Sequence, residues 1–150
     1  MRSVTAWQDH VWEDAQPEIG DERVAEVESA LGVRFADDYK ECVKRFHGGN
    51  PHDNAFEFDD PDVGRMGSCL GILLSFSRDD PSNIIERYRR LSPFLPEGLI
   101  PFGEDGGGDF ICFQYRGSDP PTVVYWHHGE RSVVPLAPTF SAFIEMLRPE

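Results

Sequence analysis

Residues 101–113, PFGEDGGGDFICF, place three consecutive glycines between two aspartates, with an apolar stretch on each side. A phosphate-binding loop needs Lys followed by Ser or Thr after its glycines and then a helix, but here Asp109 and an alternating stretch follow. A calcium loop needs oxygen ligands at alternating positions, and Gly107 stands two residues after Asp105. Because glycine adopts the positive φ angles of tight turns, this stretch predicts a bulged hairpin turn built by the three glycines, with both aspartates at its rim.

Further strands are expected on both sides of this hairpin. Alternating or apolar runs rich in β-branched and aromatic residues are typical of strands. The expected strands span residues 55–58, 69–76, 99–103, 110–115, 122–128 and 130–137. The last of them is interrupted by Pro135, which has no N–H for a ladder hydrogen bond. A polar loop is expected at residues 59–67, between the first two strands.

Helices are expected toward both ends of the chain. Apolar residues recur at intervals of three and four in residues 21–31, 37–47, 82–91 and 140–147. Asp21, Asp80 and Thr139 are the expected N-terminal caps of the first, third and fourth helix. Residues 1–19 form an N-terminal extension with a short helix around Trp7 and Trp12. The predicted fold is an α+β domain, a mainly antiparallel sheet flanked by an N-terminal helix pair and a C-terminal helix.

Length and charge limit the possible functions. The chain has 150 residues, which favours a single domain over residues 1–150, and its formal net charge is −13. Such a charge repels nucleic acid and anionic membranes, and it attracts a basic protein. Solubility alone is the other interpretation of this charge. No secretory signal or membrane-spanning run is visible, so we expect a cytoplasmic protein.

The nucleophiles and metal-ligating residues do not form a persuasive active site. The three cysteines are far apart in the sequence and show no C-x-x-C spacing, which indicates free thiols. His127 and His128 point to opposite faces of an expected strand, so they do not bind one metal ion together. Cys112 lies mid-strand among apolar residues, where a thiol is usually inert. We therefore expect no enzyme, no catalytic residue, no metal and no cofactor.

Several motifs in a fixed order resemble the SMI1/KNR4 family of the SUKH superfamily. In that family a helix similar to residues 24–35, VAEVESALGVRF, precedes a Leu-Pro-x-x-Tyr step and a helix that ends in Asn-Gly-Gly. Here the corresponding residues 34–49 read RFADDYKECVKRFHGG. Tyr39, Gly48 and Gly49 match the pattern, whereas Ala36 replaces its Pro and His47 replaces its Asn.

The C-terminal half carries the rest of the resemblance, which covers about residues 20–147. Residues 95–113, LPEGLIPFGEDGGGDFICF, are similar to the Pro-Phe-Gly-x-x-Gly-Gly-Gly-Asp step of the family. Residues 123–130, VVYWHHGE, match a Val-Val-Tyr-Trp-Asp-His step with His127 in place of Asp. Residues 136–147, LAPTFSAFIEML, match the closing Phe-x-x-Phe helix.

The resemblance implies a small, non-catalytic bacterial immunity protein that binds and blocks a cognate polymorphic toxin. Nuclease toxin domains tend to be basic, and the acidic composition of this chain suits such a partner. We expect a monomer that forms a 1:1 complex with the toxin and binds neither nucleic acid nor membranes. The candidate toxin-binding residues lie in two acidic loops and one strand: Asp59, Asp60, Asp62, Glu104, Asp105, Asp109 and His127.

Two other functions remain open at this point. The same fold serves as a regulatory scaffold that binds a cellular protein partner, as some eukaryotic relatives do. A hydrolase that uses Asp105, Asp109 and His127 is a weaker hypothesis. Solvated loop charge without a partner is the simplest interpretation of both acidic loops.

Overall fold

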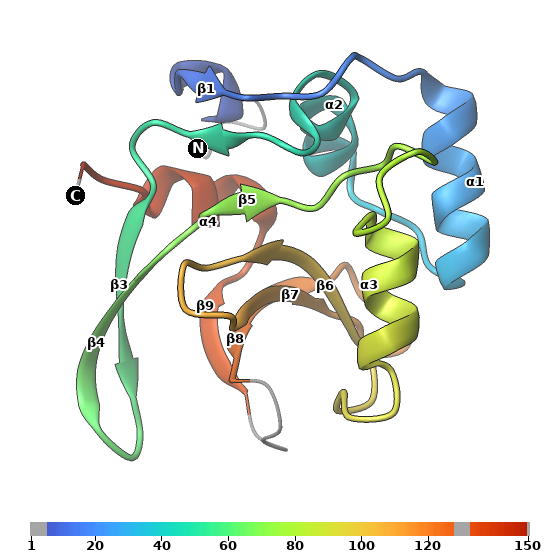
Figure 1. Ribbon diagram of the computed structural model, residues 1–150. Coiled ribbons are helices and arrows are strands. Elements are labelled where there is room, and N and C mark those ends of the chain that lie inside the picture. Colours follow the sequence, from blue (N-terminus) through green and yellow to red (C-terminus); the bar gives the residue numbers. More distant parts are fainter. Residues whose placement is uncertain (1–5, 128–132, 150) are drawn as a thin grey trace.

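A five-stranded antiparallel sheet forms the centre of the protein (Figure 1). The computed structural model describes residues 6–127 and 133–149. Strand order in the sheet is β5-β6-β7-β8-β9, so neighbouring strands follow one another along the chain. The strands are β5 (Ile72–Leu73), β6 (Leu99–Glu104), β7 (Phe110–Gln114), β8 (Thr122–Trp126) and β9 (Val134–Ala137).

The predicted alternation of side chains in β7 is confirmed, because its two faces join different apolar clusters. Ile111 and Phe113 belong to the larger cluster, in which α2 (Asp37–Phe46) and α4 (Phe140–Met146) also bury their apolar sides. Phe110 and Cys112 belong to a smaller cluster on the other face, with Leu91 of α3 (Ile84–Leu91) packed against it. The remaining helix, α1 (Asp21–Leu31), buries Val24, Val27 and Leu31.

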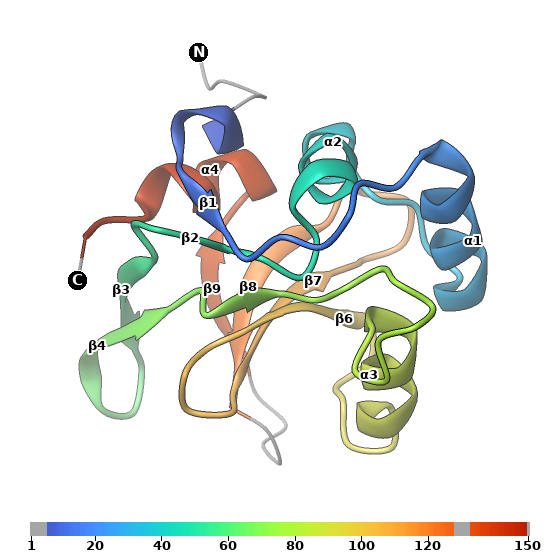
Figure 2. The same ribbon diagram turned by 45° about the horizontal axis from the view of Figure 1, so that its top comes forward.

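A separate two-stranded hairpin stands beside the main sheet, formed by β3 (Ala55–Asp60) and β4 (Gly64–Cys69). Figures 1 and 2 show its closed end reaching away from the helices. The polar loop predicted at residues 59–67 was too long, since only residues 61–63 separate the strands. Arg65 lies opposite Asp59 in the ladder and pairs with its carboxylate, so the polar residues here are strand residues with charged partners.

The short helix expected around Trp7 and Trp12 is present only at Trp7, as a 3-10 turn, and the chain is extended at Trp12. Residues Ala6–Asp9 form a short 3-10 helix, and Trp12–Glu13 (β1) pair with Asn50–Pro51 (β2). The Trp12 ring stacks on Phe46 with centroids 5.1 Å apart, and its Nε1 donates to the carbonyl oxygen of Trp7. These tertiary contacts hold the chain extended where local periodicity suggested a helix.

Two of the three predicted helix caps were wrong, and Thr139 was right. The Thr139 hydroxyl accepts from the amide of Ala142 at the start of α4. Asp21 is the first residue of α1 itself and pairs with Lys44 of α2 at 2.7 Å. Asn83, which accepts from the amide of Glu86, caps α3 in place of Asp80. Asp80, four residues before the first residue of α3, accepts from the amide of Ser82, so it closes a turn that is complete before the helix starts.

The predicted glycine turn is confirmed as the connection between β6 and β7, which pair antiparallel. Of its three glycines only Gly108 has a positive φ, +92°. The ladder irregularity lies within β6, between Pro101 and Gly103, and not in the turn. At Gly103 a Cβ atom would lie 2.6 Å from the end of the Leu70 side chain and 3.3 Å from the carbonyl oxygen of Ile72, so a larger residue there would displace the buried Leu70.

Candidate functional site

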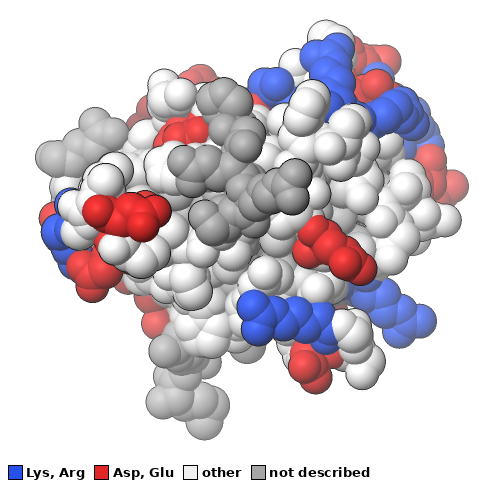
Figure 3. Space-filling model, turned by 90° about the horizontal axis from the view of Figure 1, so that it is seen from below, with Lys and Arg blue, Asp and Glu red and all other residues white. Residues whose placement is uncertain are grey.

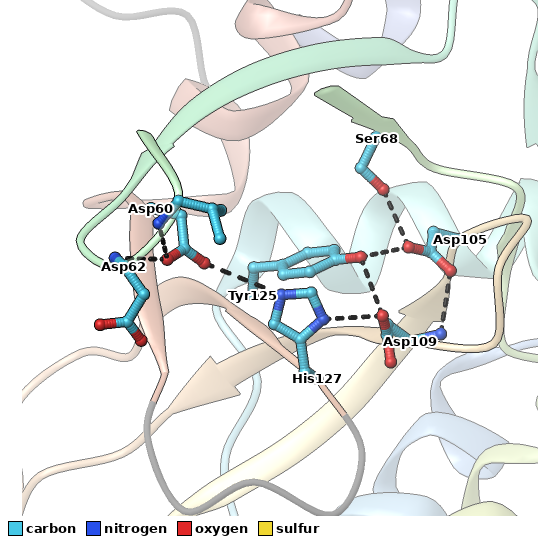
Figure 4. A network of polar contacts seen from close by, with 8 residues as sticks. Asp60, Asp62, Ser68, Asp105, Asp109, Tyr125 and His127 are labelled. Atoms are coloured by element: carbon cyan, nitrogen blue, oxygen red, sulfur yellow. Dashed lines mark hydrogen bonds and ion pairs between the residues drawn. The ribbon is translucent and has the colours of Figure 1, made fainter. Parts of the chain in front are cut away.

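The two acidic loops named from the sequence meet in space around one histidine. Figure 4 shows the carboxylate–histidine network, which we define as six side chains from the hairpin, the glycine turn and β8 with the residue after it. Its members are Asp60, Ser68, Asp105, Asp109, Tyr125 and His127. Residues separated by up to 67 positions in the sequence thus share one set of polar contacts.

The glycine turn positions Asp105 by closing on its carboxylate. Oδ1 of Asp105 accepts from the amides of Gly107, at 2.8 Å, and Asp109, at 2.9 Å. Oδ2 accepts from the hydroxyls of Ser68, at 2.9 Å, and Tyr125. Burial by itself acts to raise the pKa of Asp105, but the hydrogen bonds from Tyr125, the two amides and Ser68 outweigh it and lower that pKa. Asp105 is therefore an ionised anchor of the turn.

Tyr125 extends the network from β8. Its hydroxyl reaches both aspartates of the turn and lies 3.3 Å from Oδ2 of Asp109. Burial of the ring raises the pKa of Tyr125, and the hydrogen bond to the Asp105 carboxylate raises it further. The phenol is thus a proton donor to the turn throughout the physiological pH range.

His127 connects the glycine turn to the hairpin. Its Nδ1 lies 2.8 Å from Oδ2 of Asp109, and its Nε2 lies 3.8 Å from Oδ2 of Asp60. The side chains of Asp60 and Asp109 are only 10% and 19% exposed, so both carboxylates sit in partly desolvated positions. Oδ1 of Asp60 accepts from the amides of Asp62 and Val63, which fixes the hairpin turn. A histidine between two such carboxylates draws the two loops together.

The other predicted site residues point elsewhere. Asp59 is exposed and pairs with Arg65 at 3.2 Å, and Asp62 is exposed at the hairpin turn. Glu104 turns to Arg87 of α3, with 2.5 Å between Oε1 and the guanidinium. Burial raises the pKa of Glu104, and Arg87 offsets part of that rise. Of the seven residues named from the sequence, four therefore belong to the network and three do not.

Ser68 and Tyr125 were missed by the sequence analysis. A signal for Tyr125 did exist, because residues two apart on a strand share a face and Tyr125 precedes His127 by two. Nothing in the sequence pointed to Ser68, since its contact with Asp105 depends on how the hairpin lies against the sheet.

Neither Ser68 nor Cys112 is arranged as a nucleophile beside a histidine. A serine nucleophile needs its hydroxyl on the histidine base, but Ser68 donates to Asp105. Cys112 belongs to the cluster on the opposite face of the sheet from Tyr125, and burial raises the pKa of its thiol. Among residues 6–127 and 133–149, no group of three or more His, Cys, Asp or Glu side chains is arranged to hold a metal ion.

Acidic residues do not form one continuous surface on the face seen in Figure 3. Red groups lie apart from one another there, with blue and white side chains between them. The broad acidic face that the composition suggested is therefore not present on the side seen in Figure 3. The hairpin is the segment in which several acidic side chains do lie close together. Exposed acidic side chains Glu57, Asp59 and Asp62 lie on this hairpin with one basic residue, Arg65.

Comparisons with known proteins agree with the motif order. The family model described as SMI1 / KNR4 family (SUKH-1) matches residues 18–146. A comparison with curated proteins gives no match. No helix among the described residues is long and apolar enough to cross a membrane.

Proposed function

Since the chain belongs to the SMI1/KNR4 family (SUKH-1), we propose that it is an immunity protein that binds and neutralises a cognate polymorphic toxin. The toxin is a basic, nuclease-type domain, and it binds the β3–β4 hairpin together with the neighbouring glycine turn. One observation carries this proposal: the carboxylate–histidine network joins the two acidic loops into a single preformed surface. A surface ordered before binding loses less conformational entropy on association.

The charge of the hairpin supports a basic partner, because its exposed carboxylates outnumber its one arginine. Arg65 pairs with both Glu57, at 3.5 Å, and Asp59, at 3.2 Å, and Asp62 is a third exposed carboxylate. Val63 at the turn is 66% exposed and supplies an apolar contact beside these charges. An apolar centre with charged surroundings is typical of protein–protein interfaces.

The proposal includes the absence of catalysis. The carboxylates of Asp105 and Asp109 accept hydrogen bonds from within the fold, which supports a structural role. A broad hydrolase screen with and without divalent metal ions tests this, and we expect no turnover. Turnover that disappears in Asp109→Asn, with the fold intact, would replace this proposal with the hydrolase hypothesis.

Binding is tested with the protein encoded next to the gene for this chain. Coexpression is expected to give a 1:1 complex in the cytoplasm, and association is expected to slow roughly tenfold between low salt and 0.5 M NaCl. The double variant Asp59→Asn/Asp62→Asn is expected to associate several-fold more slowly, on the order of threefold to tenfold. Asp119→Asn, an exposed acid in the turn at the other end of β7, is the matched control and is expected to behave as wild type. Absence of binding at micromolar concentration would refute the proposed function.

A further inference from the structure

The hairpin carries an open strand edge, and this inference about it rests on the proposed function. Strand β4 pairs with β3 alone, in a two-stranded sheet. In Figure 1 the closed end of the hairpin projects from the body of the protein. We propose that the outer edge of β4 receives an extended, basic segment of the toxin as an added strand.

The hydrogen-bond pattern shows which backbone groups face outward. Both the amide and the carbonyl of Ala55 bond to Arg148, so Ala55 does not bond to its ladder partner Cys69. Because hydrogen-bonded pairs alternate along an antiparallel ladder, Ser68 and Met66 bond to β3, whereas Arg65 and Gly67 point their backbone groups to the outer edge. Among the described residues, the backbone N–H and C=O groups of Arg65 and Gly67 make no hydrogen bond outside the β3–β4 ladder.

The hairpin that carries this strand edge is packed against the body of the protein. Phe56 and Phe58 are buried, and their rings contact Phe143 of α4 and Tyr125 of β8, with the Phe58 and Tyr125 centroids 4.8 Å apart. Ser68 and Asp60 add polar contacts to the glycine turn and His127. Open backbone groups on an ordered strand are the arrangement that β-strand addition requires.

Gly67 gives the edge its selectivity for a basic residue. It is exposed and lies opposite Glu57 in the ladder, so this position places no side chain between Glu57 and an incoming strand, although Arg65 contacts Glu57 from two residues away at 3.5 Å. A groove of about 830 Å³ lies over this face of the hairpin, lined by Glu57, Gly67 and Cys69 and, from the C-terminal segment, by Met146, Arg148 and Pro149. A Lys or Arg opposite Gly67 in the added strand is two strand spacings, roughly 10 Å, from β3, a span that its long side chain and that of Glu57 cover together above the glycine.

Charge decides between a basic segment and a second copy of this chain. Two copies paired edge to edge would bring together like-charged hairpins from molecules of net charge −13. A basic strand instead meets Glu57, Asp59 and Asp62, with Val63 beside them as an apolar contact. The acidic side chains thus protect the edge from self-association while leaving it open to a cationic partner.

Residue-resolved hydrogen exchange tests the added strand, with the protein encoded next to the gene for this chain as the partner. In the free protein, the amides of Arg65 and Gly67 are expected to exchange at least tenfold faster than those of Met66 and Ser68. In the complex, the amides of Arg65 and Gly67 are expected to become protected by at least tenfold. A complex without that protection would overturn the added strand and leave the proposed function standing, whereas no complex at all would overturn both.

A pair of variants at one position separates backbone pairing from side-chain contact. Gly67→Pro removes the outward N–H and is expected to weaken binding at least tenfold. Gly67→Ala keeps the N–H, and its Cβ would meet only the carbonyl oxygen of Phe56, at 4.0 Å, so wild-type binding is expected. Equal binding by both folded variants would contradict the proposal. Protection of Arg65 and Gly67 in the free protein that grows with its concentration would show a homodimer edge and also contradict it.

Discussion

Asp60, at the end of β3, lies 3.8 Å from Nε2 of His127, which follows β8 and contacts Asp109 through Nδ1. This relationship ties the closed end of an otherwise separate hairpin to the central sheet. The Asp60 side chain is only 10% exposed, so water competes little with His127 for this carboxylate. The hairpin is therefore ordered both by its buried phenylalanines and by this polar contact.

His127→Phe is expected to loosen the hairpin locally. Loss of both carboxylate contacts costs about 1 kcal/mol, which corresponds to roughly fivefold faster exchange of the ladder amides of Phe58 and Met66. The measurement is native-state hydrogen exchange. His52→Phe, which removes an exposed histidine paired with Glu13, is the control and is expected to leave these amides unchanged. Unchanged exchange in His127→Phe would show that the phenylalanines alone order the hairpin.

Tyr125→Phe is expected to destabilise the protein in a pH-dependent way. The pKa of Asp105 is lowered in the folded state, so its contribution to stability is present above its ordinary value of 3.8 and is lost as the pH falls through the folded-state pKa. Removing the Tyr125 hydroxyl removes part of this contribution, about 1 kcal/mol near pH 7. Urea unfolding should show a difference from wild type that shrinks below pH 4.

Tyr115→Phe is the matched control for that experiment. The Tyr115 hydroxyl donates to the carbonyl oxygen of Arg34, at 2.9 Å, and not to a carboxylate. Its loss is expected to lower stability by the same amount at every pH from 3 to 7. Parallel pH profiles for Tyr125→Phe and Tyr115→Phe would refute the role assigned to Asp105.

His47 is expected to make the protein less stable in mild acid. Its ring is buried, with Nε2 2.8 Å from the carbonyl oxygen of Pro17, and Nδ1 accepts from the amide of Phe76 at 3.0 Å. This is the neutral tautomer, and burial lowers the pKa of His47 below its ordinary value of 6.5. The unfolded chain then binds more protons than the folded one, so the free energy of unfolding falls as the pH drops below 6.5.

His47→Asn isolates this effect. Asparagine also offers one acceptor and a donor, but it does not titrate in this range. The fall in unfolding free energy between pH 8 and pH 5 is expected to be smaller in His47→Asn than in wild type, as measured by urea unfolding at each pH. The same slope in both proteins would assign the effect to other groups.

The three glycines of the turn are expected to differ in their tolerance of alanine. Gly108→Ala places a side chain at φ +92° and is expected to cost about 1–2 kcal/mol. At Gly106 and Gly107 a Cβ meets only ordinary contacts, 3.8 Å from Cys69 and 3.6 Å from Asp105, so alanine should change stability by less than about 0.5 kcal/mol. Thermal unfolding of the three single variants measures this, and equal losses would contradict the described turn.

Much of the fold was predictable because local patterns agreed with the tertiary structure. The helices near residues 21–31 and 37–46 and the strands on both sides of the glycine turn follow from periodicity and from glycine itself. The prediction of secondary structure failed where contacts between distant parts of the chain determine the backbone conformation. Trp12 is extended because it stacks on Phe46, and residues 59–60 and 64–67 are strand because the two arms of the hairpin pair with each other.

The sequence by itself determined the order of the elements, the hairpin at the three glycines and the negative charge of the chain, because these depend on neighbouring residues and on composition. Only the tertiary structure decided that Asp60 and Asp109 approach the same histidine, that Glu104 turns away to Arg87, and that the edge of β4 is open. The physical reason is that packing of the hairpin against β8 and α4 joins segments far apart in the chain, and no local pattern records which side chains then meet.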